Sequence, residues 1–317
     1  MPDSIEKSLK EHSLDGVFTE VTHSEKLGIT VPEQLRLFYL DVLDNRFDLE
    51  KMKSQLYLNV GTYAFSRSVV DRLTKAGHAD VIIDQAKRIL QKKGADVRGT
   101  GSELGEMLNY VFTEEKLDAP KLMSRVELST DGASYGSTTD NIHLLSTAVS
   151  GKPYHQVVFG SSSIVGDLKY AINNAFKRIV NIEQHKTDEL GLVDNLILNT
   201  PADRFSSDAD IAFLKEMFVP SEGKKAQRIT SYAIFLGYTI GLIPENYTPD
   251  EFPALLENKI VDDLRRHLHI ILQNINDNHL GNKHFYFFIV PFNDAEEDKK
   301  KVMEDILKGD VNLIWPT

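Results

Sequence analysis

The segment 101–176 limits the possible folds more than any other part of the chain, because its apolar residues change their spacing several times. Helical spacing alternates there with short runs that are typical of strands. In chain order we predict a helix, a strand, a buried strand and a helix, at 102–113, 142–144, 156–159 and from Asp167 onward. Helices and strands mixed in this way predict an α/β fold, with a small mixed central sheet flanked by helices. Ser102 is the expected N-cap of the first helix.

The region before this segment predicts further helices. We expect residues 1–98 to be mainly helical. Helices are predicted to begin at Pro32, to cover 49–75 and 79–93, and to stop at Gly94.

Residues 99–317 form the second predicted region, an α/β core with a helical C-terminal part. A weak internal boundary lies at 199–225, where proline, glycine and serine become frequent. The aromatic and β-branched run at 285–290 predicts a strand that joins the central sheet. Alternation at 125–130 predicts another strand, with a hairpin connection around Gly132.

The composition excludes several kinds of protein. The 317 residues carry a formal net charge of −11 and include no cysteine, so no disulfide or Cys-ligated metal site can form. With no signal-peptide pattern and no apolar run long enough to cross a bilayer, we expect a cytoplasmic protein with no membrane partner. A free-standing DNA-binding protein usually presents a basic face. The basic residues that do cluster are more typical of the solvated side of a helix, and they are Lys87, Arg88, Lys92, Lys93 and Arg98.

Acidic residues in the segment 101–176 indicate a candidate metal site. Mg²⁺ takes oxygen ligands, and a metal-dependent phosphodiesterase needs carboxylates that converge on the ion. Asp140, at the head of a strand, and Glu103 or Glu106, on the first helix, are the candidates. Each has a plain alternative, since an aspartate can close a turn and a first-turn glutamate can satisfy the helix dipole.

Such a site can also use a Glu-x-Lys pair on the next strand, where residues two apart share a face. This chain has Ser161 and Ser163 at those positions. Serine supplies neither the carboxylate charge nor the cation. A catalytic site made of these serines and the three acidic residues would therefore be weakened.

Other motifs carry less weight. Asp167 and Lys169 form an Asp-x-Lys, but on the first turn of a helix, where residues two apart diverge by about 200°. The Gly/Ser-rich stretch 160–166 lacks the Gly-Lys-Ser/Thr ending of a phosphate loop and the final glycine of Gly-x-Ser-x-Gly. Four histidines near the C-terminus are spaced for satisfied or exposed side chains rather than for zinc, at His267, His269, His279 and His284.

With these residues in view, the chain resembles the HamA family, the effector subunits of Hachiman antiphage defence. The likeness covers most of the chain and rests on Gly101–Glu106, Ala119–Leu122, Asp140-x-x-His143, the strand that ends at Gly160, and the helix at Ala171–Phe176. The resemblance implies a core of the PD-(D/E)xK nuclease superfamily, similar to restriction endonucleases, that acts on DNA with Mg²⁺. It also implies a HamB-like helicase partner, which senses aberrant DNA, restrains the nuclease and delivers the DNA to this acidic chain.

By the same resemblance Asp140 is the metal-binding aspartate, Glu103 or Glu106 is the helix glutamate, and Glu-x-Lys falls on Ser161 and Ser163. Two functions from different classes stay open. One is a Mg²⁺-dependent nuclease effector, and the other is a non-catalytic, nuclease-like subunit that binds and regulates the helicase. A third interpretation is an unrelated α/β scaffold whose acidic residues are all structural.

Overall fold

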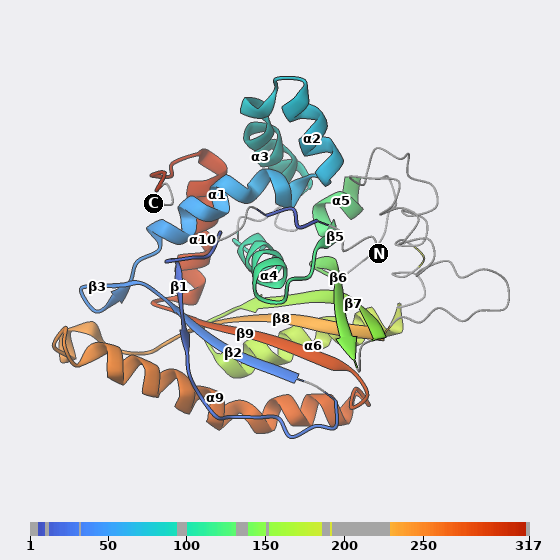
Figure 1. Cartoon of the computed structure of the whole chain (residues 1–317). Coiled ribbons are helices and arrows are strands. Elements are labelled where there is room, and N and C mark those ends of the chain that lie inside the picture. Colours follow the sequence, from blue (N-terminus) through green and yellow to red (C-terminus); the bar gives the residue numbers. More distant parts are fainter. Residues whose placement is uncertain are drawn as a thin grey trace, which may run out of the picture.

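The chain is built around one seven-stranded sheet, in the order β1-β2-β9-β8-β7-β6-β5 (Figure 1). The computed structural model describes residues 6–9, 13–31, 33–93, 100–130, 139–149, 152–185, 191 and 229–314. The α/β class expected from the sequence is confirmed, and the sheet is larger than the small one expected.

The strands of this sheet come from both ends of the described chain. They are β1 (Phe18–Val21), β2 (Glu33–Leu40), β5 (Lys121–Ser124), β6 (Asn141–Val149), β7 (Lys152–Ile164), β8 (Ile229–Thr239) and β9 (His284–Phe292). The central strands β2, β9, β8 and β7 run parallel, while β1 on one side and β6 and β5 on the other pair antiparallel. A separate hairpin joins β3 (Val42–Leu43) to β4 (Arg46–Phe47).

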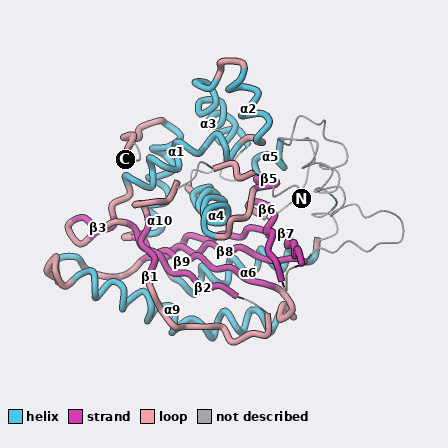
Figure 2. Tube along the Cα trace, in the orientation of Figure 1, coloured by secondary structure: helices cyan, strands magenta, loops and turns pink. Residues whose placement is uncertain are grey.

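Helices cover both faces of the sheet (Figures 1 and 2). They are α1 (Glu50–Ala64), α2 (Arg67–Lys75), α3 (Ile82–Lys93), α4 (Glu103–Lys116), α5 (Arg125–Thr130), α6 (Leu168–Gln184), α9 (Phe252–Asp277) and α10 (Ala295–Lys308). α4 packs on β7 and β8 and is covered in turn by α1 and α10. α6 packs on β7 and β8 from the opposite face, with α9 against it.

Aromatic side chains hold α4 across the middle of the sheet. The Phe112 ring of α4 lies 5.0 Å from the Phe38 ring of β2, 5.6 Å from Phe235 of β8 and 5.2 Å from Phe288 of β9, between ring centroids. β9 is buried along its whole length, as expected of a central strand in a sheet covered on both faces. These contacts bury nearly every residue of α4 and so fix the acidic residues that it carries.

Two sequence predictions are wrong. Residues 33–40 form β2 rather than a helix, because β2 pairs in parallel with the aromatic strand β9 and this tertiary pairing overrides local spacing. Residues 125–130 form α5 rather than a strand. The cause is a capping box, in which Glu127 Oε2 accepts from Ser124 N at 2.8 Å and Ser124 Oγ accepts from Glu127 N at 3.3 Å.

Several other predictions are confirmed. The helix at 102–113 is α4, although the Ser102 side chain makes no capping hydrogen bond. The helix predicted from Asp167 onward is α6, and the Asp167 side chain caps it by accepting from Tyr170 N at 3.2 Å. The strand at 285–290 is β9 and belongs to the central sheet.

Some predicted features lie outside the described residues, namely the stop at Gly94, the turn around Gly132 and the boundary at 199–225. Within the described part of the chain, no helix is both long and apolar enough to cross a bilayer.

Candidate functional site

Asp140 and Glu106 come together where α4 passes the start of β6. Asp140 N donates to Gly160 O at 3.0 Å, which holds the aspartate directly before β6 and beside β7. Asn141 Nδ2 donates to Glu106 O at 3.4 Å and ties α4 to the same point. Both acidic residues are buried, with 0% of Asp140 and 1% of Glu106 exposed. Glu103, one turn earlier on α4, is also buried, and its charge contributes to raising the pKa of Glu106.

Two arginines contact this acid pair. Arg178 Nη1 lies 2.7 Å from Asp140 Oδ1, and Arg178 Nη2 lies 3.9 Å from Glu106 Oε1. Arg125 Nη1 donates to Glu106 Oε1 at 2.8 Å. On the other carboxylate oxygen, Tyr63 OH donates to Glu106 Oε2 at 3.0 Å. We call Glu106, Asp140, Arg125 and Arg178 the charge cluster.

Arg178 comes from α6, on the opposite side of the sheet from α4, and reaches the cluster past the end of a strand pair. β6 pairs with β7 only as far as Phe159, whereas β7 continues beside β8 to Ile164. Gly160 O accepts from Asp140 N at the edge of β7 that faces β6. The carbonyl two residues further along β7, Ser162 O, points to the same edge of the strand. Arg178 Nη1 donates to Ser162 O at 3.0 Å and so occupies this edge of β7.

Burial and charge act against each other in the cluster. Burial is the main cause that raises the pKa of Glu106 to about 7, the Asp140 charge adds to it, and Arg125 and Arg178 oppose it. Burial likewise raises the pKa of Asp140, and the Arg178 charge is the largest opposing cause. A buried carboxylate is costly unless it is paired and hydrogen-bonded. The two guanidinium groups therefore make the burial of both acids tolerable.

The predicted serines lie on the other face of β7 from Glu103 and Glu106. Ser161 Oγ donates to Ala175 O of α6 at 3.0 Å. Ser162 instead faces α4, since a Cβ added at Gly105 would lie 2.7 Å from Ser162 Oγ. Side chains alternate along a strand, so Ser163 shares the α6 face with Ser161. The structure thus brings Asp140 and Glu106 together but does not bring Ser161 and Ser163 to them.

The described residues do not fit a Mg²⁺ site. Mg²⁺ demands octahedral oxygen coordination, yet Tyr63, Arg125 and Arg178 already engage both Glu106 oxygens and Asp140 Oδ1. Asp140 Oδ2 is buried and has no hydrogen-bond partner, although the Ser162 and Asn109 side chains are close enough to lower the pKa of this carboxyl. Within the described ranges, no group of three or more His, Cys, Asp or Glu side chains could hold a metal ion.

The other motifs of the sequence have structural roles. The Gly/Ser-rich stretch after 159 is the end of strand β7, not a loop that could surround a phosphate. Asp167 caps α6, and Lys169 is exposed. Arg88 is exposed and pairs with Asp84 at 3.0 Å, as expected of a solvated helix face, whereas Arg98 lies outside the described residues.

Sequence reasoning missed the two arginines and Tyr63. The sequence around Arg178 did contain a sign of its role. Arg178 follows Ala175 by three residues and directly precedes Ile179, so it borders the buried stripe of α6. A cation at the border of an apolar stripe can reach a buried acid. The signal at Arg125 was weaker, because this residue begins a helix where the local alternation predicts a strand.

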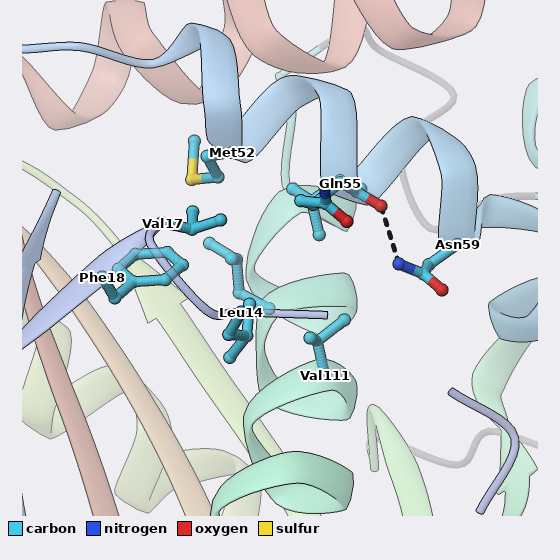
Figure 3. A pocket seen from close by; sticks show the side chains of 9 residues that line it. Leu14, Val17, Phe18, Met52, Gln55, Asn59 and Val111 are labelled. Atoms are coloured by element: carbon cyan, nitrogen blue, oxygen red, sulfur yellow. Dashed lines mark hydrogen bonds between the residues drawn. The ribbon is translucent and has the colours of Figure 1, made fainter. Parts of the chain in front are cut away.

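A small pocket between α1, α4 and the chain around the start of β1 shares no lining residue with the charge cluster (Figure 3). Its lining is mostly apolar and includes Leu14, Phe18, Met52 and Val111. The polar Asn59 at its rim donates from Nδ2 to Gln55 O at 2.8 Å. With no titratable side chain in its lining, this pocket offers no catalytic group.

Comparison with known protein families gives a match over most of the chain. The model of a protein family described as HamA matches residues 16–306, which include every member of the charge cluster. A search of curated proteins finds no match.

Proposed function

The chain belongs to the HamA family and is therefore a subunit of Hachiman antiphage defence, and from this premise we propose that it binds and regulates a HamB-like helicase without a metal-dependent step of its own. In this proposal the chain keeps a nuclease-like arrangement of helix, aspartate and strand but uses it as a scaffold. The helicase engages the DNA, which agrees with the net charge of −11 on this chain.

The charge cluster is the observation that carries the proposal. Arg178 and Arg125 supply the positive charge that the two buried carboxylates require. The side chains that could have completed a nuclease site are serines that face α6. A cluster that is already neutralised by its own arginines has no need of a divalent cation.

A second candidate is a Mg²⁺-dependent DNA nuclease that the helicase holds inactive. One observation favours it: Asp140 Oδ2 is a buried carboxylate oxygen without a partner, which is unusual in a purely structural ion pair. In that case the arginines would have to leave the carboxylates before the chain could act.

A plasmid assay separates the two candidates. Supercoiled plasmid with Mg²⁺ is incubated with the wild-type chain and with a Ser161→Glu/Ser163→Lys variant, each alone and with the helicase. We expect no nicking in any of the four reactions, because positions 161 and 163 face α6 rather than the acid pair. Nicking by the wild-type chain would refute the non-catalytic proposal. Nicking by the double variant alone would show that the site is a disabled nuclease.

Protection of cells against phage tests the same proposal without a DNA substrate. Asp140→Asn keeps the size of the side chain and one acceptor oxygen for Arg178, but removes the charge. A non-catalytic subunit should retain both protection and co-purification with the helicase. Loss of protection by an Asp140→Asn chain that still melts cooperatively and still binds the helicase would favour the nuclease.

A further inference from the structure

Glu114, near the end of α4, is a buried carboxylate whose partners come mainly from the start of the chain. The residue is 0% exposed. Its two oxygens accept from Ser8 N at 3.1 and 3.0 Å and from Leu9 N at 2.8 Å. Glu114 Oε1 also accepts from Ser8 Oγ at 2.9 Å and from Lys121 N at 2.6 Å. Two successive backbone N–H groups and a hydroxyl of one short segment thus converge on a single buried acid.

Further contacts hold the same segment along its length. Arg67 Nη1 donates to Glu6 O, and Lys7 Nζ lies 2.8 Å from Asp118 Oδ1. The Leu9 side chain is buried against the core. We call residues Glu6–Leu9 the N-terminal strap. The strap contacts the chain through main-chain groups at three of its four residues, which is how extended peptides are recognised.

The accepting carboxylate, Glu114, belongs to the rest of the molecule, which also contributes a donor to it. This donor is Lys121 N, on β5. The Lys121 ammonium group is directed elsewhere, to Glu127 Oε2 at 2.9 Å and to the carbonyls of Thr62, Tyr63 and Phe65 at the end of α1. Without the strap, Glu114 would keep the Lys121 N donor and lose the Ser8 N, Ser8 Oγ and Leu9 N donors, which water would have to replace. The rest of the molecule therefore presents a carboxylate that a segment with two successive backbone N–H groups can satisfy.

The strap also touches the side chains that lead to the charge cluster. Ser8 Oγ is 2.8 Å from Tyr110 OH, and the Tyr110 ring lies 5.7 Å from the Tyr63 ring between centroids. Tyr63 OH donates to Glu106 Oε2. A continuous set of contacts thus joins the strap to Glu106 over two turns of α4.

We propose that α4, β5 and the α1–α2 junction form a peptide-binding site centred on Glu114, whose occupant is the chain's own N-terminal segment. The strap is a separable ligand that fills this site in cis and can be replaced by the same segment supplied as a free peptide. The strap lies before residue 16, where the HamA match begins, whereas Glu114 and Lys121 lie within the matched residues. Filling the site orders Tyr110 and Tyr63 beside Glu106. The proposal holds whether or not the charge cluster is catalytic.

Binding of a labelled peptide to full-length variants tests the site. The peptide spans residues 1–13 and carries a fluorophore at its C-terminus, and its anisotropy is measured with the wild-type chain, Ser8→Pro and Ser8→Ala. Proline at position 8 removes the backbone donor, whereas alanine keeps it and serves as the matched control. We expect binding to Ser8→Pro, and binding about tenfold or more weaker to the wild-type and Ser8→Ala chains, whose sites are filled in cis. A peptide that itself carries Ser8→Pro should not bind.

Equal binding to all three chains, or no binding to a Ser8→Pro chain that folds, would overturn the proposal. Hydrogen exchange on the wild-type chain gives an answer even where Ser8→Pro does not fold. The amides of Ser8 and Leu9 should be protected, and Glu114→Gln, which keeps the shape but removes the charge, should make them exchange faster. Unprotected amides in the wild-type chain would equally contradict a filled site.

Discussion

At the scale of single residues, arginine side chains supply the positive charge that the buried carboxylates need. Asp140 and Glu106 are both removed from water, and each is contacted by a guanidinium group. Arginine stays charged at any working pH and offers several donors in a fixed plane, which suits a site that must satisfy two carboxylates and a carbonyl. Arg178 does this for Asp140 Oδ1 and Ser162 O.

Replacement of Arg178 by alanine should therefore destabilise the chain. Asp140 would remain buried without its cation, and we expect the free energy of unfolding to fall by about 2–4 kcal/mol. Adding Asp140→Asn to that variant should recover part of the loss, because a neutral amide needs no counter-ion. Arg88→Ala is the matched control, since Arg88 forms an exposed pair with Asp84, and its effect should stay within about 0.5 kcal/mol. Denaturant titration measures all four chains; equal losses for Arg178→Ala and Arg88→Ala would contradict the role given to the cluster.

His143 predicts how stability depends on pH. The ring is buried, its Nδ1 donates to Ala119 O at 2.7 Å, and burial lowers its pKa from 6.5 to about 3. Between these values the unfolded chain binds a proton that the folded chain does not. The free energy of unfolding thus falls by about 1.4 kcal/mol per pH unit as pH decreases below 6.5, from this group alone.

Replacing His143 by glutamine should remove that contribution. The slope of the free energy of unfolding against pH, measured between pH 4.5 and pH 6, should be shallower than in the wild-type chain by about 1 kcal/mol per unit. His185→Gln is the control, because His185 makes the same kind of contact, Nδ1 to Asn181 O, on the exposed surface. Unchanged slope in His143→Gln would mean that the imidazole is not buried in its neutral form.

At the scale of elements, α4 sits close to β7 because glycine allows it. A Cβ built on Gly105 would lie 2.7 Å from Ser162 Oγ and 3.1 Å from Ser162 Cβ. Glycine is otherwise unfavourable inside a helix. The gain is the close approach that places Glu106 beside the start of β6.

Gly105→Ala should lower the free energy of unfolding by about 1–2 kcal/mol, since the cost of the overpacked contact exceeds the gain in helix propensity. Ser162→Ala removes the nearest atom. The free energy of unfolding of the Gly105→Ala/Ser162→Ala chain should therefore fall by less than the sum of the losses in the two single variants. Thermal and denaturant unfolding of the four chains gives the coupling. A more stable Gly105→Ala chain would show that α4 lies farther from β7 than the structure has it.

At the scale of the whole molecule, the sheet joins segments that are far apart in sequence. β2 pairs with β9 over Glu33–Leu37 and Phe285–Ile289, and α1 near the N-terminal end packs on α4 and α10. The Lys53 ammonium group of α1 lies 2.9 Å from Asp305 of α10. The region before residue 99 therefore supplies strands and a covering helix to the sheet that the rest of the chain forms.

A chain that begins at residue 99 should not fold by itself. Without β2 the buried strand β9 would become an exposed apolar edge, and without α1 one side of α4 would face water. We expect weak near-UV circular dichroism, binding of a hydrophobic dye and no cooperative melting, in contrast to the full-length chain. A sharp, reversible transition in the shortened chain would instead support an independent domain after residue 98.

The amino-acid sequence by itself determined the α/β class, the helices α4 and α6, the strand β9 and the presence of acids at 103, 106 and 140, because hydrophobic spacing within one element is a local property. It also carried the resemblance to the HamA family. Only the tertiary structure decided that residues 33–40 form a strand, since their partner is β9. It alone decided that Arg178 reaches Asp140 while Ser161 faces α6. Those contacts depend on where β6 stops pairing with β7 and on which helix covers each face, and neither is encoded in the spacing of any one segment.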